Sequence, residues 1–255
     1  MTYSQILNIK LKLEKTFKPE IKKQFSKTLA AMTEFVLLHG VPSATRKQLA
    51  EWESILENHY IRCQKMFDPR RKKSEDMTEE ERAIVLALLL WREQQARNKA
   101  FKITETTRKN AYQSIQQARE ILAEQGIASP SNAEISRTAK ELMRKRFNGR
   151  VDVIAMVETQ AASETTRFEW AGSEFAEPDE PIDRPSVVPV PVYKVWRTRM
   201  DKLVRAGHKV VEGQRRLKSE SFNVMGESLM YPGDTSLGAT MRNVAGCRCA
   251  SLFSW

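Results

Sequence analysis

Apolar residues recur at steps of three and four through the first 170 or so positions, which is the spacing of one face of an α-helix. A first helix, with Ile6 and Leu13 on its apolar face, is expected to stop near Pro19, because proline has no N–H to donate within a helix. Pro19 can itself open a second helix, which is predicted to end at His39-Gly40.

Cap residues mark three further helix starts. Ser43 is expected to cap a helix that reaches Phe67. Two capping boxes, in which a side-chain oxygen and a glutamate satisfy free amides at a helix start, are predicted at Thr78-Glu-Glu-Glu81 and at Ser131-Asn-Ala-Glu134.

The nine-residue apolar run 83–91 follows the first capping box and predicts a buried helix. Separate helices are expected over residues 107–125, from the second box to Gly149, and from Val151 onward. No repeat of fixed period occurs. The upstream half is therefore predicted to be an assembly of helices.

The composition changes after Gly172. Residues 173–192 hold five prolines and several acids, which favours an extended linker. Residues 187–195 are interpreted as an edge strand or an extended arm. A helix near Thr198–His208 and hairpin-like segments are expected beyond it.

The predicted fold is mainly α: a multi-helix N-terminal region, a proline-rich linker and a small α+β C-terminal module. The expected boundaries are a helical domain over 1–149, a connecting helix over 150–172, the acidic linker over 173–192 and the module over 193–255.

The charge is distributed unevenly along these regions. The 255 residues include 42 Lys and Arg against 32 Asp and Glu, for a net charge of +10. Residues 1–150 hold 29 basic and 18 acidic side chains (+11), residues 151–192 hold 2 and 9 (−7), and residues 193–255 hold 11 and 5 (+6). Segregated positive charge favours a polyanion or an acidic partner.

Composition also excludes some classes. The longest apolar run has nine residues, whereas spanning a bilayer takes about 20, and no secretion signal is recognised at the start. Three cysteines are too few for a disulfide framework and suit a reducing compartment. We therefore expect a chain made in a cytoplasm, with no membrane partner.

The C-terminal module holds the most specific pattern in the chain. In order, it contains Trp196-Arg-Thr, Asp201, Arg205, His208, Gly213, Phe222, Tyr231-Pro-Gly-Asp234, Asn243 and Cys247-Arg-Cys249. This order resembles the C-terminal domain of the phage Mu F-like minor head proteins, also called head morphogenesis proteins. The resemblance covers about residues 145–255, and it departs from the family at Gly246, where the family commonly has asparagine.

The resemblance implies a minor head protein of a tailed phage, located in the virion at the portal vertex or the head interior and present in the host cytoplasm during assembly. It implies portal or major capsid protein as a partner, a part in head assembly, and non-specific contact with packaged double-stranded DNA. The 173–192 arm is interpreted as a contact between copies of the chain. A free helical DNA-binding accessory protein is the alternative.

The motif residues allow three interpretations. Asp201, Arg205 and His208 would share one stripe of the predicted helix, while Cys247 and Cys249 would face one side of a strand. His208, Cys247 and Cys249 then offer three zinc ligands, with Asp201 or Asp234 as the fourth.

Structural zinc sites are usually filled by four Cys or His ligands, so no cofactor is assigned. A Cys–His–Asp enzyme using Cys247, His208 and Asp201 is the least favoured alternative, because no strained nucleophile turn accompanies the residues. The favoured interpretation is a structural hydrogen-bonded cluster without catalysis. Trp196 is interpreted as a core anchor, and Tyr231-Pro232-Gly233-Asp234 as a type II turn.

Three basic patches are candidates for contact with DNA phosphates, without sequence readout. They are Lys10, Lys12, Lys15, Lys18, Lys22, Lys23 and Lys27; Arg70, Arg71, Lys72 and Lys73; and Arg144, Lys145 and Arg146. Solvated helix faces or an acidic portal surface are the alternatives. No zinc finger or basic zipper is present, so sequence-specific recognition is not expected.

Overall fold

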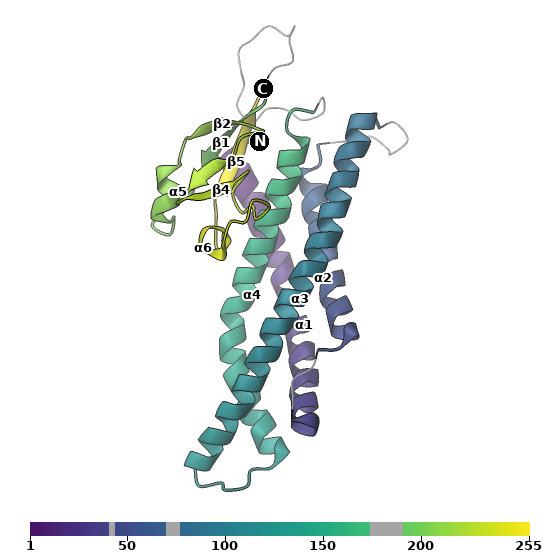
Figure 1. Cartoon of the computed structure of the whole chain (residues 1–255), viewed down its shortest axis with the longest axis vertical. Helices are drawn as coiled ribbons and strands as arrows, with labels where there is room; N and C mark the ends of the chain where they lie inside the picture. The colour runs from purple at the N-terminus through teal and green to yellow at the C-terminus, as the bar shows by residue number, and fades with distance from the viewer. Residues whose placement is uncertain (41–43, 70–76, 174–190) are drawn as a thin grey trace. The chain divides into compact units, whose positions relative to one another are not determined.

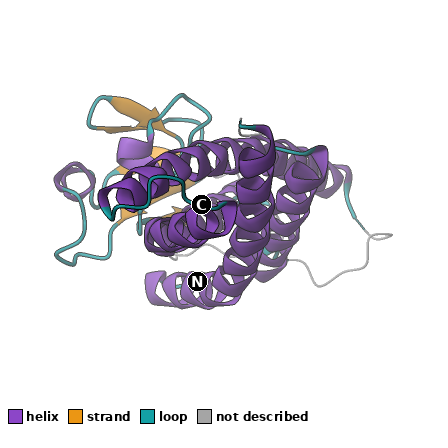
Figure 2. Ribbon diagram, turned by 90° about the horizontal axis from the view of Figure 1, so that it is seen from below, coloured by secondary structure: helices purple, strands orange, loops and turns teal. Residues whose placement is uncertain are grey.

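The computed structural model describes residues 1–40, 44–69, 77–173 and 191–255. Four long packed helices are followed by a small region of short strands and helices, and 67% of the described residues are helical (Figure 1). The mainly α prediction with a small α+β C-terminal part is confirmed. Figure 2 shows the strands together in one part of the molecule, with helices and connecting loops elsewhere.

The chain divides into two compact units, and neither is continuous in sequence. The first unit contains residues 1–15, 59–92 and 156–255, and the second contains residues 16–58 and 93–155. The 149/150 boundary expected from the sequence lies inside a continuous helix.

Helix α1 (Tyr3–His39) runs through Pro19, so the predicted break there is wrong. Residues at steps of four on both sides of the proline, including Leu13, Phe17, Ile21 and Phe25, are buried. Pro19 itself is exposed. Burial of the large side chains, each about 1.5–3 kcal/mol, offsets the loss of one backbone hydrogen bond, so the helix continues.

Helix α2 spans Arg46–Phe67. Its cap is Thr45 and not Ser43: the Thr45 N–H donates to Gln48 Oε1 and the Gln48 N–H donates to Thr45 Oγ1. Ser43 lies outside the described residues. The reciprocal bonds form a capping box in which Gln48, the third residue of the helix, takes the place of the more common glutamate. The box satisfies two backbone amides, whereas a single serine cap satisfies one.

The other two capping boxes are confirmed. Thr78 and Glu81 exchange hydrogen bonds at the start of α3 (Glu79–Glu124), and Ser131 and Glu134 do so at the start of α4 (Asn132–Trp170). Both helices are longer than predicted. The expected separate helix over 107–125 belongs to α3, and α4 passes through Gly149 without a break, because a helix supported by packing tolerates one glycine at about 1 kcal/mol.

The apolar run 83–91 is only partly buried, contrary to expectation. Leu88 is buried, whereas Leu86 and Leu90 are each 55% exposed. A helix places residues two apart on different sides, so a continuous apolar run on a partly packed helix leaves some of its side chains in solvent.

The core of the second unit is built on aromatic contacts. The Phe25 ring stacks on Phe147 at 4.7 Å between centroids and meets the edge of Trp52 at 4.8 Å. The guanidinium of Arg150 lies 5.2 Å from the centre of the Phe25 ring, and burial lowers its pKa. Trp52 Nε1 donates to Thr28 Oγ1 at 3.2 Å, so its polar atom is satisfied.

The C-terminal part of the first unit contains two small antiparallel sheets. In the first, β1 (Tyr193–Arg197) lies between β2 (Arg215–Leu217) and β5 (Ala250–Ser254). The second pairs β3 (Phe222–Val224) with β4 (Glu227–Leu229). Two short helices, α5 (Ala206–Val210) and α6 (Met241–Val244), complete it.

Strand β1 is central and not an edge strand, because it pairs on both sides: Val195 lies opposite Arg215 and Leu252. The predicted 173–192 linker lies mostly outside the described residues. Its flanks meet: a Cβ on Gly172, whose φ is +84°, would lie 2.3 Å from Val192 Cγ2, so only glycine fits there.

None of the helices in the described part of the chain is both long and apolar enough to cross a membrane.

Candidate functional site

Several motif residues of the module meet in one small core in the first unit. Trp196 from β1 is fully buried, as expected of a core anchor, and its cluster includes Val211, Phe222, Val224, Leu229, Cys247 and Cys249. The Trp196 ring meets the rings of Phe222 and His208 edge-on, at 5.2 and 5.5 Å between centroids. Motif residues that lie up to about 50 positions apart in the sequence therefore contribute to one core.

The predicted helix over Thr198–His208 is wrong. Residues 198–205 are irregular, and α5 begins only at Ala206. Asp201 therefore shares no helical stripe with His208: its two oxygens accept from Arg248 at 2.6 and 2.8 Å and from the Leu203 N–H. An aspartate that bonds to the amide two residues on stabilises a turn, which competes with helix formation.

Arg205 also differs from the expected stripe. It precedes α5, and its guanidinium donates to the carbonyl oxygen of Ala245. Arg205 and the Asp201–Arg248 pair thus connect the loop before α5 to the segment that follows α6. The bidentate geometry of the Asp201–Arg248 pair is the strong form of such a contact.

The structure brings His208, Cys247 and Cys249 together, as the sequence predicted. His208 Nδ1 lies 3.4 Å from Cys249 Sγ and 3.7 Å from Cys247 Sγ. The potential ligand atoms of the three residues all lie within 4.8 Å of one another. The local structure differs from the prediction, because the two cysteines lie in the loop before β5 and not on a strand.

The two thiols are electrostatically unequal. A hydrogen bond with the Cys249 thiol, and then contact with the His208 ring, hold the pKa of Cys247 well below its ordinary value. The same hydrogen bond raises the pKa of Cys249, with burial adding to the effect. The arrangement therefore favours one shared proton and one thiolate beside an imidazole.

Neither aspartate considered as a fourth zinc ligand joins this group within the described residues. Asp201 is held by Arg248. Asp234 accepts from the amides of Met230 and Ser236 at 2.8 and 2.7 Å. Within the described residues, Asp201 contacts Arg248, Arg199 and the Leu203 N–H, whereas His208 Nδ1 lies against the two sulfurs, so these contacts do not include the Asp–His hydrogen bond of a Cys–His–Asp arrangement.

The turn at Tyr231-Pro-Gly-Asp234 is confirmed. The Asp234 N–H donates to the Tyr231 carbonyl at 3.1 Å, and Gly233 has a φ of +91°, as position three of a type II turn requires. A Cβ on Gly233 would also lie 2.9 Å from Gln160 Cγ. Glycine is needed here for backbone conformation and for close approach of α4.

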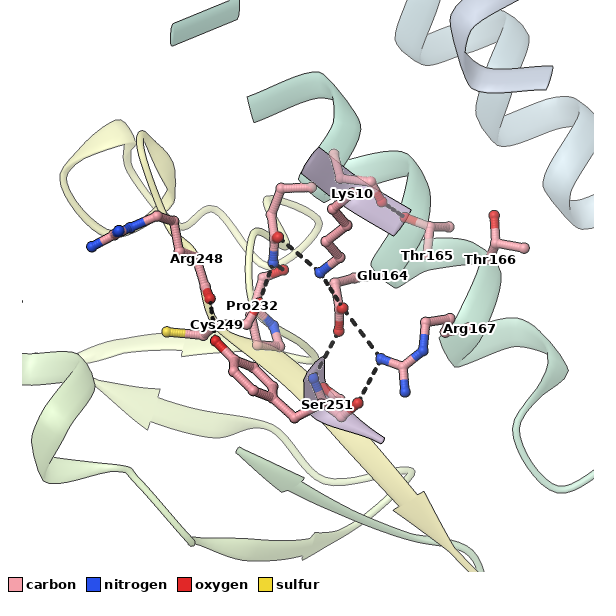
Figure 3. A network of polar contacts seen from close by, with 12 residues as sticks. Lys10, Glu164, Thr165, Thr166, Arg167, Pro232, Arg248, Cys249 and Ser251 are labelled. Atoms are coloured by element: carbon pink, nitrogen blue, oxygen red, sulfur yellow. Dashed lines mark hydrogen bonds and ion pairs between the residues drawn. The ribbon is translucent and has the colours of Figure 1, made fainter. Parts of the chain in front are cut away.

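A buried charge network holds the cysteine-bearing segment, and sequence reasoning missed it (Figure 3). Glu164 on α4 is fully buried and accepts from Lys10 Nζ at 2.6 Å, Arg167 Nη1 at 3.3 Å and the Ser251 N–H at 2.8 Å. Arg167 also donates to the Ser251 carbonyl at 2.5 Å. Figure 3 shows Lys10 and Arg167 reaching the Glu164 carboxylate from different sides.

Gln160, one turn before Glu164, extends this network to the motif. Its amide nitrogen donates to the carbonyls of Cys249 at 2.8 Å and Pro232 at 3.0 Å, and its oxygen accepts from Lys10. Tyr3 adds a hydrogen bond to the Arg248 carbonyl at 2.9 Å. The signal in the sequence was the spacing of Gln160, Glu164 and Arg167, which places three long polar side chains on one face of a helix rich in Ala, Ser and Thr.

The basic candidates divide into buried, paired and exposed side chains. Lys10 is 4% exposed and belongs to the Glu164 network, so its assignment as a phosphate contact is wrong. Lys18 pairs with Asp152 at 2.8 Å. The exposed candidates are Lys12, Lys15, Lys22, Lys23, Lys27, Arg144, Lys145 and Arg146. Residues 70–73 lie outside the described part of the chain.

Comparison with known proteins adds no assignment. No family model matches the chain, and no curated protein or solved structure does so either.

Proposed function

We propose that this chain is a minor head protein of a tailed phage. It docks at the portal vertex or on the inner capsid, aids head assembly and contacts packaged DNA without reading its sequence. The observation that carries the proposal is that four residues of the family-like sequence pattern, Trp196, His208, Cys247 and Cys249, meet in one buried core. A pattern that encodes one packing unit is a stronger basis for resemblance than scattered matches.

The DNA contact is assigned to exposed lysines of α1. Lys22, Lys23 and Lys27 in the second unit are exposed, so each ammonium can approach a phosphate. Contacts of this kind carry no sequence information. Binding releases counterions from the DNA, and this release becomes less favourable as the salt concentration rises, so the affinity falls. The acidic stretch over 151–192 is the region least suited to DNA.

A salt series tests the DNA contact. Filter binding of the full chain to duplex DNA is expected to give a linear fall of log K with log salt concentration. The triple change Lys22→Gln, Lys23→Gln and Lys27→Gln is expected to reduce that slope by about 3, because each phosphate contact contributes roughly one. The matched control is Lys47→Gln, Lys102→Gln and Lys109→Gln, which removes the same charge from other exposed positions. Equal slopes for the two triple variants would remove α1 as the DNA surface.

Docking is tested separately by co-sedimentation. The full chain is expected to sediment with procapsids or isolated portal of its own phage, in salt high enough to abolish its DNA binding. A chain that binds DNA but stays in the supernatant is the free accessory protein, and this result would overturn the head-protein proposal.

A further inference from the structure

One ring nitrogen faces two sulfurs in the module core. His208 Nδ1 lies 3.4 and 3.7 Å from the sulfurs of Cys249 and Cys247, and a neutral imidazole nitrogen carries either one proton or one lone pair. This nitrogen can make one ordinary hydrogen bond, yet it lies close to both sulfurs, as one ligand atom of a shared ion would. The other ring nitrogen, Nε2, has no hydrogen-bond partner within the described residues. The polar contacts of this side chain are therefore directed at the sulfur pair.

We propose that His208, Cys247 and Cys249 bind one zinc ion. Zinc bonds of about 2.3 Å to sulfur and about 2.05 Å to nitrogen at tetrahedral angles place a nitrogen and a sulfur ligand about 3.6 Å apart. The two observed distances bracket that value. Thiolates and imidazole are also the ligands that select zinc over calcium or magnesium.

The charges of this ligand set suit a buried position. His208, Cys247 and Cys249 are each at most 2% exposed, where an uncompensated charge is costly. Two thiolates and one Zn²⁺ sum to zero, and neutral imidazole adds nothing. Three protein ligands leave the fourth tetrahedral position to water, as in other three-ligand zinc sites.

The scaffold around the three residues holds them in place before any ion arrives. His208 is fixed on α5 against the edge of Trp196, and Gln160 holds the carbonyl of Cys249. Arg205 binds the Ala245 carbonyl two residues before Cys247. The ion would then join α5 to the loop before β5. This site does not rest on the proposed function and would exist in a protein of any role.

Metal analysis of the full chain tests the proposal. The protein is purified under reducing conditions, equilibrated with micromolar zinc, freed of unbound ion and measured by mass spectrometry. We expect close to one zinc per chain in the wild type. The zinc affinity of Cys247→Ser, Cys249→Ser and His208→Ala should be at least tenfold lower, since even changes to residues that only contact the ligands cost roughly 10–100-fold in affinity.

The chain supplies a matched control in Cys63. This thiol is also buried and lies 3.5 Å from a histidine nitrogen, His59 Nε2, but no second sulfur joins it among the described groups of potential ligands. Cys63→Ser should keep its zinc. Loss of zinc in Cys63→Ser equal to that in Cys247→Ser, or no zinc in the wild type, would overturn the proposal.

Cobalt substitution keeps the test valid if the cysteine variants do not fold. Co²⁺ added to the metal-free wild type is expected to produce thiolate-to-cobalt charge-transfer absorption that saturates at one equivalent, and one equivalent of zinc should abolish it. Saturation without any charge-transfer band would show that no thiolate is bound and would sink the proposal.

Discussion

The first unit contains two buried histidine–cysteine clusters that differ in composition and in charge. In the cluster on α2, His59 Nε2 lies 2.9 Å from Thr159 Oγ1 and 3.5 Å from Cys63 Sγ. Burial lowers the pKa of His59 to about 3 and raises that of Cys63 to about 12. Both side chains are therefore neutral near pH 7, and the cluster is a packed polar contact.

The cluster of the C-terminal module is as deeply buried but behaves differently. Its second sulfur allows Cys249 to donate to Cys247, and this contact lowers the pKa of Cys247. Burial alone therefore does not decide whether a buried cysteine holds its proton. A neighbouring hydrogen-bond donor that stabilises the thiolate also lowers the pKa of a buried cysteine. The same pair of sulfurs gives the module a set of potential metal ligands that the α2 cluster lacks.

Helix α4 supports both clusters from neighbouring positions. Glu158 accepts from the Tyr60 hydroxyl at 2.6 Å, and Thr159 contacts His59. Gln160 and Glu164 instead hold the segment that carries Cys249. Successive side chains of a helix with 3.6 residues per turn point about 100° apart. Neighbouring residues of α4 can therefore contact the α2 cluster on one side and the segment of Cys249 on another. Variants in this turn are expected to affect one cluster and spare the other.

The largest effect is expected from Glu164→Ala, which leaves the buried cations of Lys10 and Arg167 without their shared carboxylate. Breaking a buried ion pair on one side costs about 3–5 kcal/mol. Denaturant unfolding followed by circular dichroism should show a loss of this size. Thiol labelling under native conditions, located by mass spectrometry, should become faster at Cys247 and Cys249 and remain unchanged at Cys63.

The control is Glu141→Ala, which removes an exposed carboxylate from the same helix and should change the free energy of unfolding by no more than about 0.5 kcal/mol. A loss below 1 kcal/mol for Glu164→Ala would mean that the network contributes little. Faster labelling of Cys63 as well would mean that the two clusters are not independent.

Sequence reasoning found the helical class and the capping boxes because both depend on local patterns. It divided the helices wrongly at Pro19 and Gly149, where local rules favour a break. The side chains on both sides of Pro19 are buried along one continuous face, and tertiary packing of that face outweighs the local penalty. Propensity alone does not contain this information.

The candidate site was predicted in its members but not in its geometry. The spacing of Cys247 and Cys249 placed two thiols together, and the motif order added His208. The helix assumed for Asp201 does not form, because the Asp201 side chain bonds to the Leu203 amide and to Arg248, 47 residues away. Lys10 was grouped with surface lysines for a similar reason: its partner Glu164 lies 154 residues away, and composition does not reveal such pairings.

The pH dependence of stability should distinguish the α2 cluster by its buried neutral histidine. The pKa of His59 is about 3 in the folded chain and about 6.5 in an unfolded one. The unfolded state therefore binds more protons between these values, and stability falls as the pH drops below 6.5, by about 1.4 kcal/mol per unit. Denaturant unfolding at pH 6 and pH 4.5 should show about 2 kcal/mol more loss in the wild type than in His59→Leu.

The exposed histidine of α1 supplies the control for this pH series. His39→Gln should retain the wild-type pH dependence, because His39 lies at an exposed helix end. Equal pH dependence in the wild type and in His59→Leu would show that His59 takes up its proton as readily when folded as when unfolded.

The smallest effect is expected from Tyr60→Phe, which removes only the hydroxyl that donates to Glu158 Oε2 at 2.6 Å. The ring and its packing against Trp91, at 5.3 Å between centroids, are kept. A hydrogen bond to a carboxyl group contributes about 1–2 kcal/mol, so the free energy of unfolding, measured with denaturant, should fall by that amount. Tyr112→Phe on the half-exposed face of α3 should leave it unchanged. Because Gln160 and Glu164 still hold the loop of Cys249 in this variant, its thiol labelling at Cys247 and Cys249 should match the wild type. Faster labelling there would show that the turn of α4 transmits a change from one cluster to the other, and the two clusters would then have to be treated as one.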